Sequence, residues 1–227
     1  MSPADARIAD AVYDEPTDRY PHRVLGDRSE MAALRITLAD GAVHVVRWPP
    51  GMVFEDTAPR IVDLDGDGSP EVVVVESSAT EGARIAVYGL VDGAVVLRAA
   101  TAPIGQRFRW IAVAAVSDLN GDGHIEIAAV DRPHLARVLR VWRWQDGALL
   151  VVAERAGVTN HRIGEPDIAG GLRDCGAGPE IVAATPDWSA MLALRLGRDN
   201  HIAARRIGPV TGEAGFAAAL ACAAGTR

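Results

Sequence analysis

The sequence predicts an all-β protein made of four tandem units, each with about four short antiparallel strands. Two acidic, glycine-rich segments recur at a fixed spacing, and each precedes a run of Val, Ile and Ala. Asp-Gly pairs, which favour tight hairpin turns, follow both runs. We expect one domain over residues 1–227, with repeats at about 6–50, 58–101, 111–154 and 166–208 and a closing tail at 209–227.

The second repeat shows the strand pattern most clearly. Residues 59–62 lead into an acidic segment, and residues 71–75 (EVVVV) form a continuous apolar run, as in a strand buried on both faces. Residues 83–88 alternate in polarity, and an Asp-Gly pair at 92–93 leads to an apolar run at 94–98. These four segments predict one four-stranded, blade-like unit.

The third repeat has the same order. Residues 111–116 lead in, residues 126–130 form the buried strand, and residues 138–144 alternate between apolar and polar side chains. Asp146-Gly147 is the predicted turn before a last strand at 149–152.

The first and fourth repeats are weaker copies. In the fourth, residues 179–184 match the buried strand, but the preceding turn keeps only Asp174 as an acidic ligand, so we expect no calcium there. In the first, residues 21–25 (PHRVL) stand where 70–74 stand in the second repeat, and a hairpin is expected around Asp40-Gly41. Acidic residues precede that strand without the glycines, which makes a metal site doubtful.

The acidic segments read DLDGDGSPE at 63–71 and DLNGDGHIE at 118–126, a spacing of 55 residues (118 − 63). Side-chain oxygens fall at positions 1, 3, 5 and 9 in each, and glycines at positions 4 and 6 permit a backbone with positive φ. Such hard oxygen ligands around a sharp turn suit Ca²⁺ better than the stricter octahedron of Mg²⁺. The alternative is an Asp/Gly turn without metal. The two predicted calcium sites comprise Asp63, Asp65, Asp67, Ser69 and Glu71, and Asp118, Asn120, Asp122, His124 and Glu126.

This motif, followed by a Val/Ile-rich strand, resembles the FG-GAP or VCBS repeats of integrin α-subunit heads and many bacterial extracellular proteins. The resemblance implies a β-propeller with structural calcium in the turn between the first two strands of a blade. Four units fall short of the seven blades common in that family. We therefore expect a small ring of four or five blades, or a partial ring completed by a second copy, since only a complete ring protects its edges.

A ligand-binding face is predicted where equivalent strands end. Five residues after equivalent positions in three repeats come Asp27, Glu76 and Asp131. Arginine forks bind anions, and tryptophan rings stack on sugars, so an anionic ligand or glycan would fit there. In an enzyme, His134 or His161 could act as a general base oriented by Asp131. The alternative is that these acids and arginines only pair with each other. The remaining ligand candidates are Arg109, Arg132, Arg162, Trp110 and Trp188.

The tail and the cysteines leave alternatives open. Residues 212–223 are apolar enough to be buried, either as a closing strand against the first repeat, which we favour, or as a short Ala-rich helix. Cys175 and Cys222 either pair, tying the tail to the last repeat, or remain two buried thiols.

The net charge is −7, all 23 basic residues are arginine, and no basic patch with interleaved aromatics occurs, which disfavours nucleic acid. No apolar run approaches the roughly 18 residues of a membrane span, and residues 1–5 show no leader sequence. We predict a calcium-stabilised binding module that is periplasmic or secreted, its leader absent from this chain. The alternatives are a lyase or hydrolase acting on an anionic saccharide or small molecule, and a structural subunit of a larger, oligomeric ring.

Overall fold

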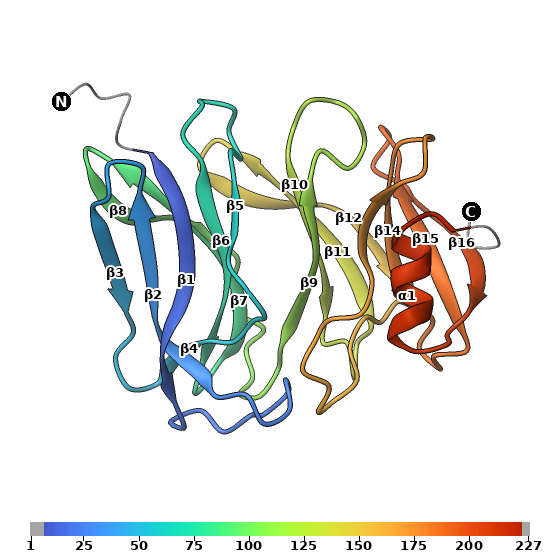
Figure 1. Ribbon diagram of the computed structural model, residues 1–227, viewed down its shortest axis with the longest axis horizontal. Coiled ribbons are helices and arrows are strands. Elements are labelled where there is room, and N and C mark those ends of the chain that lie inside the picture. The colour runs from blue at the N-terminus through green and yellow to red at the C-terminus, as the bar shows by residue number, and fades with distance from the viewer. Residues whose placement is uncertain (1–6, 224–227) are drawn as a thin grey trace. The chain divides into compact units, whose positions relative to one another are not determined.

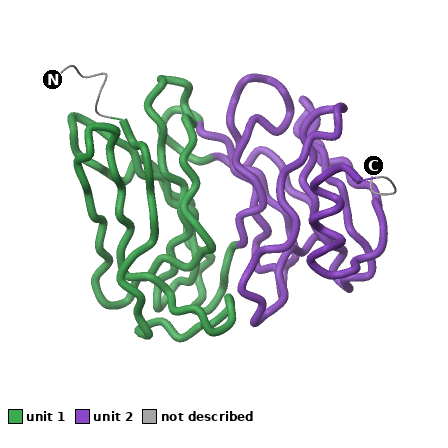
Figure 2. The backbone as a smooth tube through the Cα atoms, viewed as in Figure 1, with its two compact units in different colours: residues 1–111, 145–149 green, residues 112–144, 150–227 purple. Residues whose placement is uncertain are grey.

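The computed structural model describes residues 7–223, which contain sixteen strands and one helix (Figure 1). The chain divides into two compact units (Figure 2). Unit 1 comprises residues 1–111 and 145–149, and unit 2 comprises residues 112–144 and 150–227. Each unit is built from antiparallel strands, as the all-β prediction requires.

Unit 1 contains one eight-stranded sheet in the order β1-β2-β4-β6-β7-β8, in which β3 also pairs with β2 and β5 with β6. The short strand β4 joins the two halves, because Phe54 pairs with Met31 of β2 and with Glu76 of β6. The first two predicted repeats therefore share one sheet. The strand bounds are β1 Ile8–Thr17, β2 Glu30–Leu38, β3 Val43–Arg47, β4 Met52–Phe54, β5 Arg60–Val62, β6 Glu71–Ser78, β7 Gly82–Val91 and β8 Ala94–Ala100.

The third and fourth repeats form two four-stranded sheets, ordered β12-β11-β10-β9 and β13-β14-β15-β16. These sheets follow the predicted strand pattern, which is typical of propeller blades, while closure into a ring stays a prediction. The bounds are β9 Ile111–Ser117, β10 Glu126–Asp131, β11 Val138–Gln145, β12 Ala148–Ala156, β13 Gly171–Asp174, β14 Pro179–Ala184, β15 Ala190–Leu196 and β16 Ile202–Pro209.

The central strands are buried on both faces. All but the last residue of β6 and every residue of β10 are buried, as their continuous apolar runs predict. The two Asp-Gly turns also form as predicted. Asp92 and Gly93 have φ of 51° and 78°, and Asp146 and Gly147 have φ of 50° and 78°, the positive values that a two-residue hairpin needs.

The prediction of a buried strand at residues 21–25 is wrong. These residues lie in the connection between β1 and β2, where Arg23 has a φ of 52° and Pro21 offers no N–H for a strand ladder. Val24 and Leu25 are buried there as loop residues, so their apolar character misled the strand assignment.

The preference for a closing strand in the tail is also wrong. Residues Glu213–Leu220 form helix α1, the alternative considered for the tail. Alanine has the highest helix propensity, and three alanines follow Phe216 directly. Phe216 and Ala219 are buried in a cluster with apolar residues of β14 and β15, including Val182 and Met191. Packing against this sheet stabilises a helix that is too short to be stable in isolation.

Cys175 and Cys222 form a disulfide with a Cα–Cα distance of 5.6 Å, which ties the end of the helix region to the turn after β13. Disulfides persist mainly in oxidising compartments outside the cytoplasm. Among residues 7–223, no helix has the length and apolar character needed to cross a membrane.

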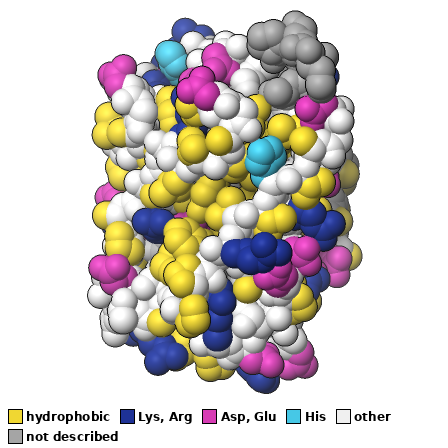
Figure 3. Space-filling model, turned by 90° about the vertical axis from the view of Figure 1, so that its left-hand side faces the viewer, with side chains coloured by type: hydrophobic (Ala, Val, Ile, Leu, Met, Phe, Trp, Pro, Cys, Tyr) yellow, Lys and Arg dark blue, Asp and Glu magenta, His cyan; other side chains and the backbone are white. Residues whose placement is uncertain are grey.

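Several large apolar side chains of unit 1 are exposed. Val43 on the edge strand β3 is 55% exposed, and Leu97 on β8 is 42% exposed. Figure 3 shows apolar side chains gathered along the middle of one face of the molecule. Exposed apolar residues are common on folded proteins, so they assign no function by themselves.

Candidate functional site

The first acidic loop, residues 63–71, connects β5 to β6 and turns at Gly66 and Gly68, whose φ values are 76° and 86°. Asp63 organises the turn, because its carboxylate accepts hydrogen bonds from the N–H groups of Gly66 (2.8 Å) and Gly68 (2.9 Å). Carboxylate oxygens of Asp63, Asp65 and Glu71 lie within 4.8 Å of one another. Three such oxygens around one centre match the ligand preference of Ca²⁺.

Glu71 is the buried member of this cluster. Its Oε2 accepts a hydrogen bond of 2.9 Å from the Leu64 N–H, which fixes the carboxylate under the loop. Burial raises the pKa of Glu71, against the lowering effect of the Leu64 hydrogen bond, and Asp65 raises it further. Neighbouring carboxylates of this kind repel one another, so a cation between them would stabilise the loop.

Arg98 of β8 supplies positive charge from the sheet side of the loop. Its guanidinium donates to Glu71 Oε1 at 2.7 Å and to Asp65 Oδ2 at 3.0 Å. The side chain crosses β7 over Gly89, where any Cβ would overlap the Arg98 Cδ. The loop therefore combines a cluster of carboxylate oxygens that could hold a cation with a positively charged side chain from the sheet.

The second loop, residues 118–126, has the same backbone turn. Asp118 accepts hydrogen bonds from the N–H groups of Gly121 (2.7 Å) and Gly123 (2.9 Å), and Glu126 accepts one from Leu119 (2.9 Å). The two loops are thus local copies of each other.

The second loop differs in how its acids are paired. Arg143 of β11 donates to Asp122 Oδ2 at 2.8 Å and also to Glu126 Oε1, while Asn120 donates to Asp122 at 3.1 Å. Burial raises the pKa of Glu126, although hydrogen bonds from Leu119 and Arg143 oppose this. Within residues 7–223, a group of three or more clustered acidic, His or Cys ligands occurs only in the first loop.

In the fourth repeat, arginines surround the glutamate at the start of the buried strand. Glu180, at the start of β14, accepts hydrogen bonds from Arg195 (2.9 Å), Arg173 (3.0 Å) and Arg205 (2.9 Å). Burial alone would raise the pKa of Glu180, but these guanidinium groups outweigh it and hold the pKa below its usual value. Sequence reasoning missed this arginine series; its signal is an arginine on the strand opposite the glutamate, as Arg143 lies opposite Glu126.

Three of the four candidates in unit 1 have local partners. Glu76 is fully buried and accepts hydrogen bonds from Tyr88 (2.5 Å) and Arg84 (2.8 Å). Trp110 donates its indole N–H to the Glu55 carbonyl at 2.7 Å, and Arg109 donates to the Phe108 carbonyl at 3.0 Å. Asp27 is exposed on the β1–β2 connection, since the strand expected to carry it does not form.

The candidates in unit 2 form three separate groups, the last of which is the Arg162–Trp188 pair described below. Asp131 binds Arg132 through two hydrogen bonds of 2.8 Å and Arg140 at 3.0 Å, which is the mutual pairing considered as an alternative. His134 and His161 lie 3.0 Å apart between Nε2 and Nδ1. The ligand and catalytic roles of these residues stay predictions.

The His161 ring has a defined proton arrangement. Its Nε2 lies 2.8 Å from the Glu165 carbonyl, which can only accept, so Nε2 carries a hydrogen and Nδ1 accepts from His134. Burial lowers the pKa of His161. The pair links the β10–β11 connection to the segment that follows Asn160.

Arg162 and Trp188 meet in a pocket of about 460 Å³ in unit 2. The guanidinium carbon of Arg162 lies 4.3 Å from the Trp188 ring centroid, a cation–π contact. The pocket is also lined by Phe216 of α1 and by three acids, which are Glu165, Asp167 and Glu213. This pocket therefore combines aromatic rings that offer a stacking surface with carboxylates that can accept hydrogen bonds.

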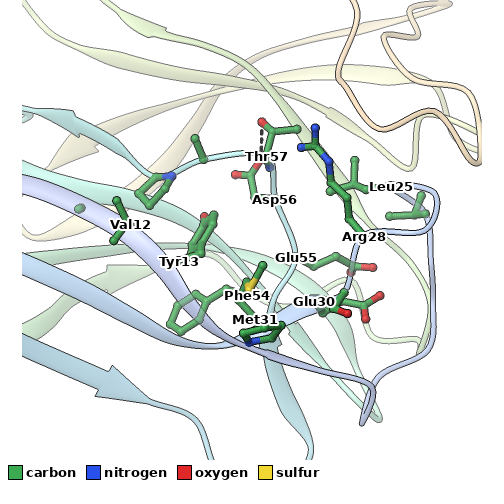
Figure 4. A pocket seen from close by; sticks show the side chains of 16 residues that line it. Val12, Tyr13, Leu25, Arg28, Glu30, Met31, Phe54, Glu55, Asp56 and Thr57 are labelled. Carbon is green, nitrogen blue, oxygen red and sulfur yellow. Dashed lines mark hydrogen bonds between the residues drawn. The ribbon is translucent and has the colours of Figure 1, made fainter.

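Unit 1 contains a second cavity, of about 450 Å³, between β1, the β1–β2 connection and the segment after β4 (Figure 4). Sequence reasoning did not find it, because its walls come from segments that are distant along the chain.

The strand order and the loops define a β-sheet protein with acidic, glycine-rich turns, one of which has an Asp/Asp/Glu cluster that could hold a metal ion. Residues 63–129, which include both loops, match the model of the FG-GAP-like repeat family. The predicted FG-GAP-like repeat is confirmed over this span, and such repeat domains are typically binding modules. A comparison with curated proteins found no match.

Proposed function

We propose that the protein is a calcium-stabilised binding module that acts outside the cytoplasm. The carboxylate cluster of Asp63, Asp65 and Glu71 within an intact FG-GAP-like loop carries this proposal. When bound, calcium would supply the positive charge that three closely placed carboxylates need. Asp67 and Ser69 would complete the ligand set of this loop.

A second calcium ion is proposed for loop 118–126. Its donors would be Asp118, Asn120, Asp122, His124 and Glu126, on the same backbone turn as in the first loop. Because Asn120 stands where the first loop has Asp65, the second loop has one fewer carboxylate, and we expect calcium to bind more weakly there. The disulfide between Cys175 and Cys222 supports an extracytoplasmic location, where calcium is abundant enough to fill weak sites.

A glycan is the ligand that best fits the pocket of unit 2. Trp188 offers a ring for stacking, and Glu165, Asp167 and Glu213 can accept hydrogen bonds from sugar hydroxyls. These acids outnumber Arg162, which makes a strongly anionic guest less favourable than a neutral or weakly charged one. An enzymatic role for His134 and His161 has less support, since Asp131 pairs with arginines.

Calcium titration tests the main proposal. Isothermal calorimetry should detect binding with a dissociation constant of about 10⁻⁴ to 10⁻³ M, as for extracellular modules, and the melting temperature should rise with calcium. The variant Asp63→Asn should lose the tighter binding event. Asp10→Asn, a change of an exposed acid on β1, is the matched control and should bind like the wild type. Absence of both heat and thermal shift in the wild type would contradict the proposal.

The glycan proposal has its own test. A neutral glucan oligosaccharide and a uronic-acid oligosaccharide should be titrated against the calcium-loaded protein, and the neutral sugar should bind at least as well. Trp188→Leu should abolish that binding and leave the calcium titration unchanged. Equal sugar binding by the variant would exclude this pocket.

A further inference from the structure

The cavity of unit 1 has a mostly apolar wall. Tyr13 of β1 and Phe54 of β4 stack with their ring centroids 5.5 Å apart, and Met31 of β2 lies beside them (Figure 4). The Tyr13 hydroxyl is buried beside the backbone of Val75. Apolar cavities of this size with a few polar groups are typical binding sites for small molecules.

Two buried carboxylates lie in the same cavity. Glu30 is 7% exposed and Glu55 is 2% exposed, although one begins β2 and the other follows β4. Figure 4 shows their carboxylates on one side of the cavity, across from Tyr13. Buried acids are rare unless they are compensated, which makes this pair notable.

The known partners of these acids only partly compensate them. Glu55 binds His22 at 2.6 Å and the Ser77 hydroxyl at 2.5 Å, while Glu30 accepts one backbone hydrogen bond, from Arg23, at 3.1 Å. Burial raises the pKa of Glu55; hydrogen bonding to His22 opposes this, and the nearby Glu30 raises it further. A cation placed against both carboxylates would lower the cost of burying them.

The other charged groups of the cavity lie apart from this pair. The third acid, Asp56, forms an ion pair with Arg60. The Arg28 side chain extends toward the side of the cavity where Asp56 and Thr57 lie, as Figure 4 shows. The Glu30 side is therefore the negative end of the cavity, and the Tyr13–Phe54 wall is its apolar end.

We propose that this cavity binds a small organic cation, namely a primary ammonium group on an aromatic or branched aliphatic body. The three N–H donors of an ammonium group match carboxylate acceptors on Glu30 and Glu55, while the apolar body would cover Tyr13 and Phe54. The inference rests on the proposed binding function but concerns a site separate from the calcium loop.

Three probes of similar size and different charge test the proposal. Phenethylamine, 2-phenylethanol and 3-phenylpropionate should be titrated by calorimetry into the full chain with saturating calcium at pH 7. We expect the ammonium compound to bind at least tenfold more tightly than the alcohol, and the carboxylate compound to bind weakest. Equal binding of amine and alcohol, preference for the carboxylate, or no binding of the amine at 10 mM, would overturn the proposal.

Charge-removing variants locate the site. Glu30→Gln keeps the shape of the side chain and should weaken amine binding about tenfold or more, with little effect on the alcohol. Glu81→Gln, a change of an exposed acid in the turn between β6 and β7 and outside both pockets, is the matched control and should leave amine affinity unchanged. Circular dichroism and the melting temperature check that both variants fold. If Glu30→Gln does not fold, Glu55→Gln serves as the second variant and should weaken amine binding measurably; unchanged affinity in a folded variant of either acid would overturn the assignment.

The calcium titration separates this inference from the proposed function. If calcium binds as expected but the amine does not, the cavity assignment fails and the calcium-stabilised module stands. If the amine binds selectively but calcium causes no response, the calcium-stabilised module fails and the cavity assignment stands.

Discussion

The Arg98 side chain passes over Gly89, which has no side chain, and donates a hydrogen bond of 2.7 Å to Glu71. The same relationship recurs with Arg143 and Glu126, where the arginine lies directly opposite the glutamate. In both loops the last acidic residue is thus shared between the turn, through a backbone N–H, and the sheet, through an arginine. This arrangement couples the acidic turns to the strands behind them.

Gly89→Ala should destabilise the protein by about 1–3 kcal/mol, because the new Cβ would displace the Arg98 side chain in a packed region. Urea unfolding measures the change. In an Arg98→Ala background the same substitution should cost much less, because the overlapping side chain is gone. Equal costs in both backgrounds would show that Arg98 does not pass over Gly89.

Arg143→Gln should lower stability in the presence of a chelator by about 2 kcal/mol, since Glu126 is left buried with a weaker partner. Calcium should recover most of this loss, because it replaces the missing positive charge. Unfolding in urea with and without calcium checks both effects. A loss that calcium does not reduce would argue against metal binding in the second loop.

Removing the disulfide should destabilise the fold. Cys175 and Cys222 are separated by 47 residues, and closing a loop of that length stabilises a protein by up to about 4 kcal/mol in the chain-entropy model. A reductant should therefore lower the melting temperature of the wild type. The double variant Cys175→Ser/Cys222→Ser should melt at that lower temperature and no longer respond to the reductant; an unchanged melting temperature would contradict the pairing.

Acid should weaken the fourth repeat through Glu180. Its pKa is lowered in the folded state, so its contribution to stability is fully present above the unfolded value of 4.5 and is lost as the pH falls through the folded pKa. Stability from urea unfolding should decline below about pH 4.5. Glu180→Gln should be less stable than the wild type at pH 7 and show a shallower decline. An identical decline in the variant would assign the acid sensitivity to other groups.

The sequence predicted the second and third repeats because their signals are local. Asp-Gly pairs set the hairpins, continuous apolar runs marked the buried strands, and the spacing of acids and glycines in 63–71 predicted the cation-binding turn. Such features depend on the backbone preferences of neighbouring residues. These predictions therefore require no knowledge of the rest of the fold.

Other features followed from contacts that local signals do not encode. Residues 21–25 look like a strand, but the chain turns there and buries Val24 within a loop. The Ala-rich tail had two possible forms, and packing of Phe216 against the last sheet favours the helix.

The sequence by itself therefore determined the all-β class, the strand pattern of the second and third repeats, and the acidic turns. Only the tertiary structure decided which charges meet. Arg98 reaches Glu71 because Gly89, which has no side chain, lies between them on the sheet. Glu30 and Glu55 line the same cavity because β4 joins the two halves of one sheet. The physical reason is that ion pairs and cavities depend on distances between strands, whereas turns and strand patterns depend on the backbone preferences of adjacent residues.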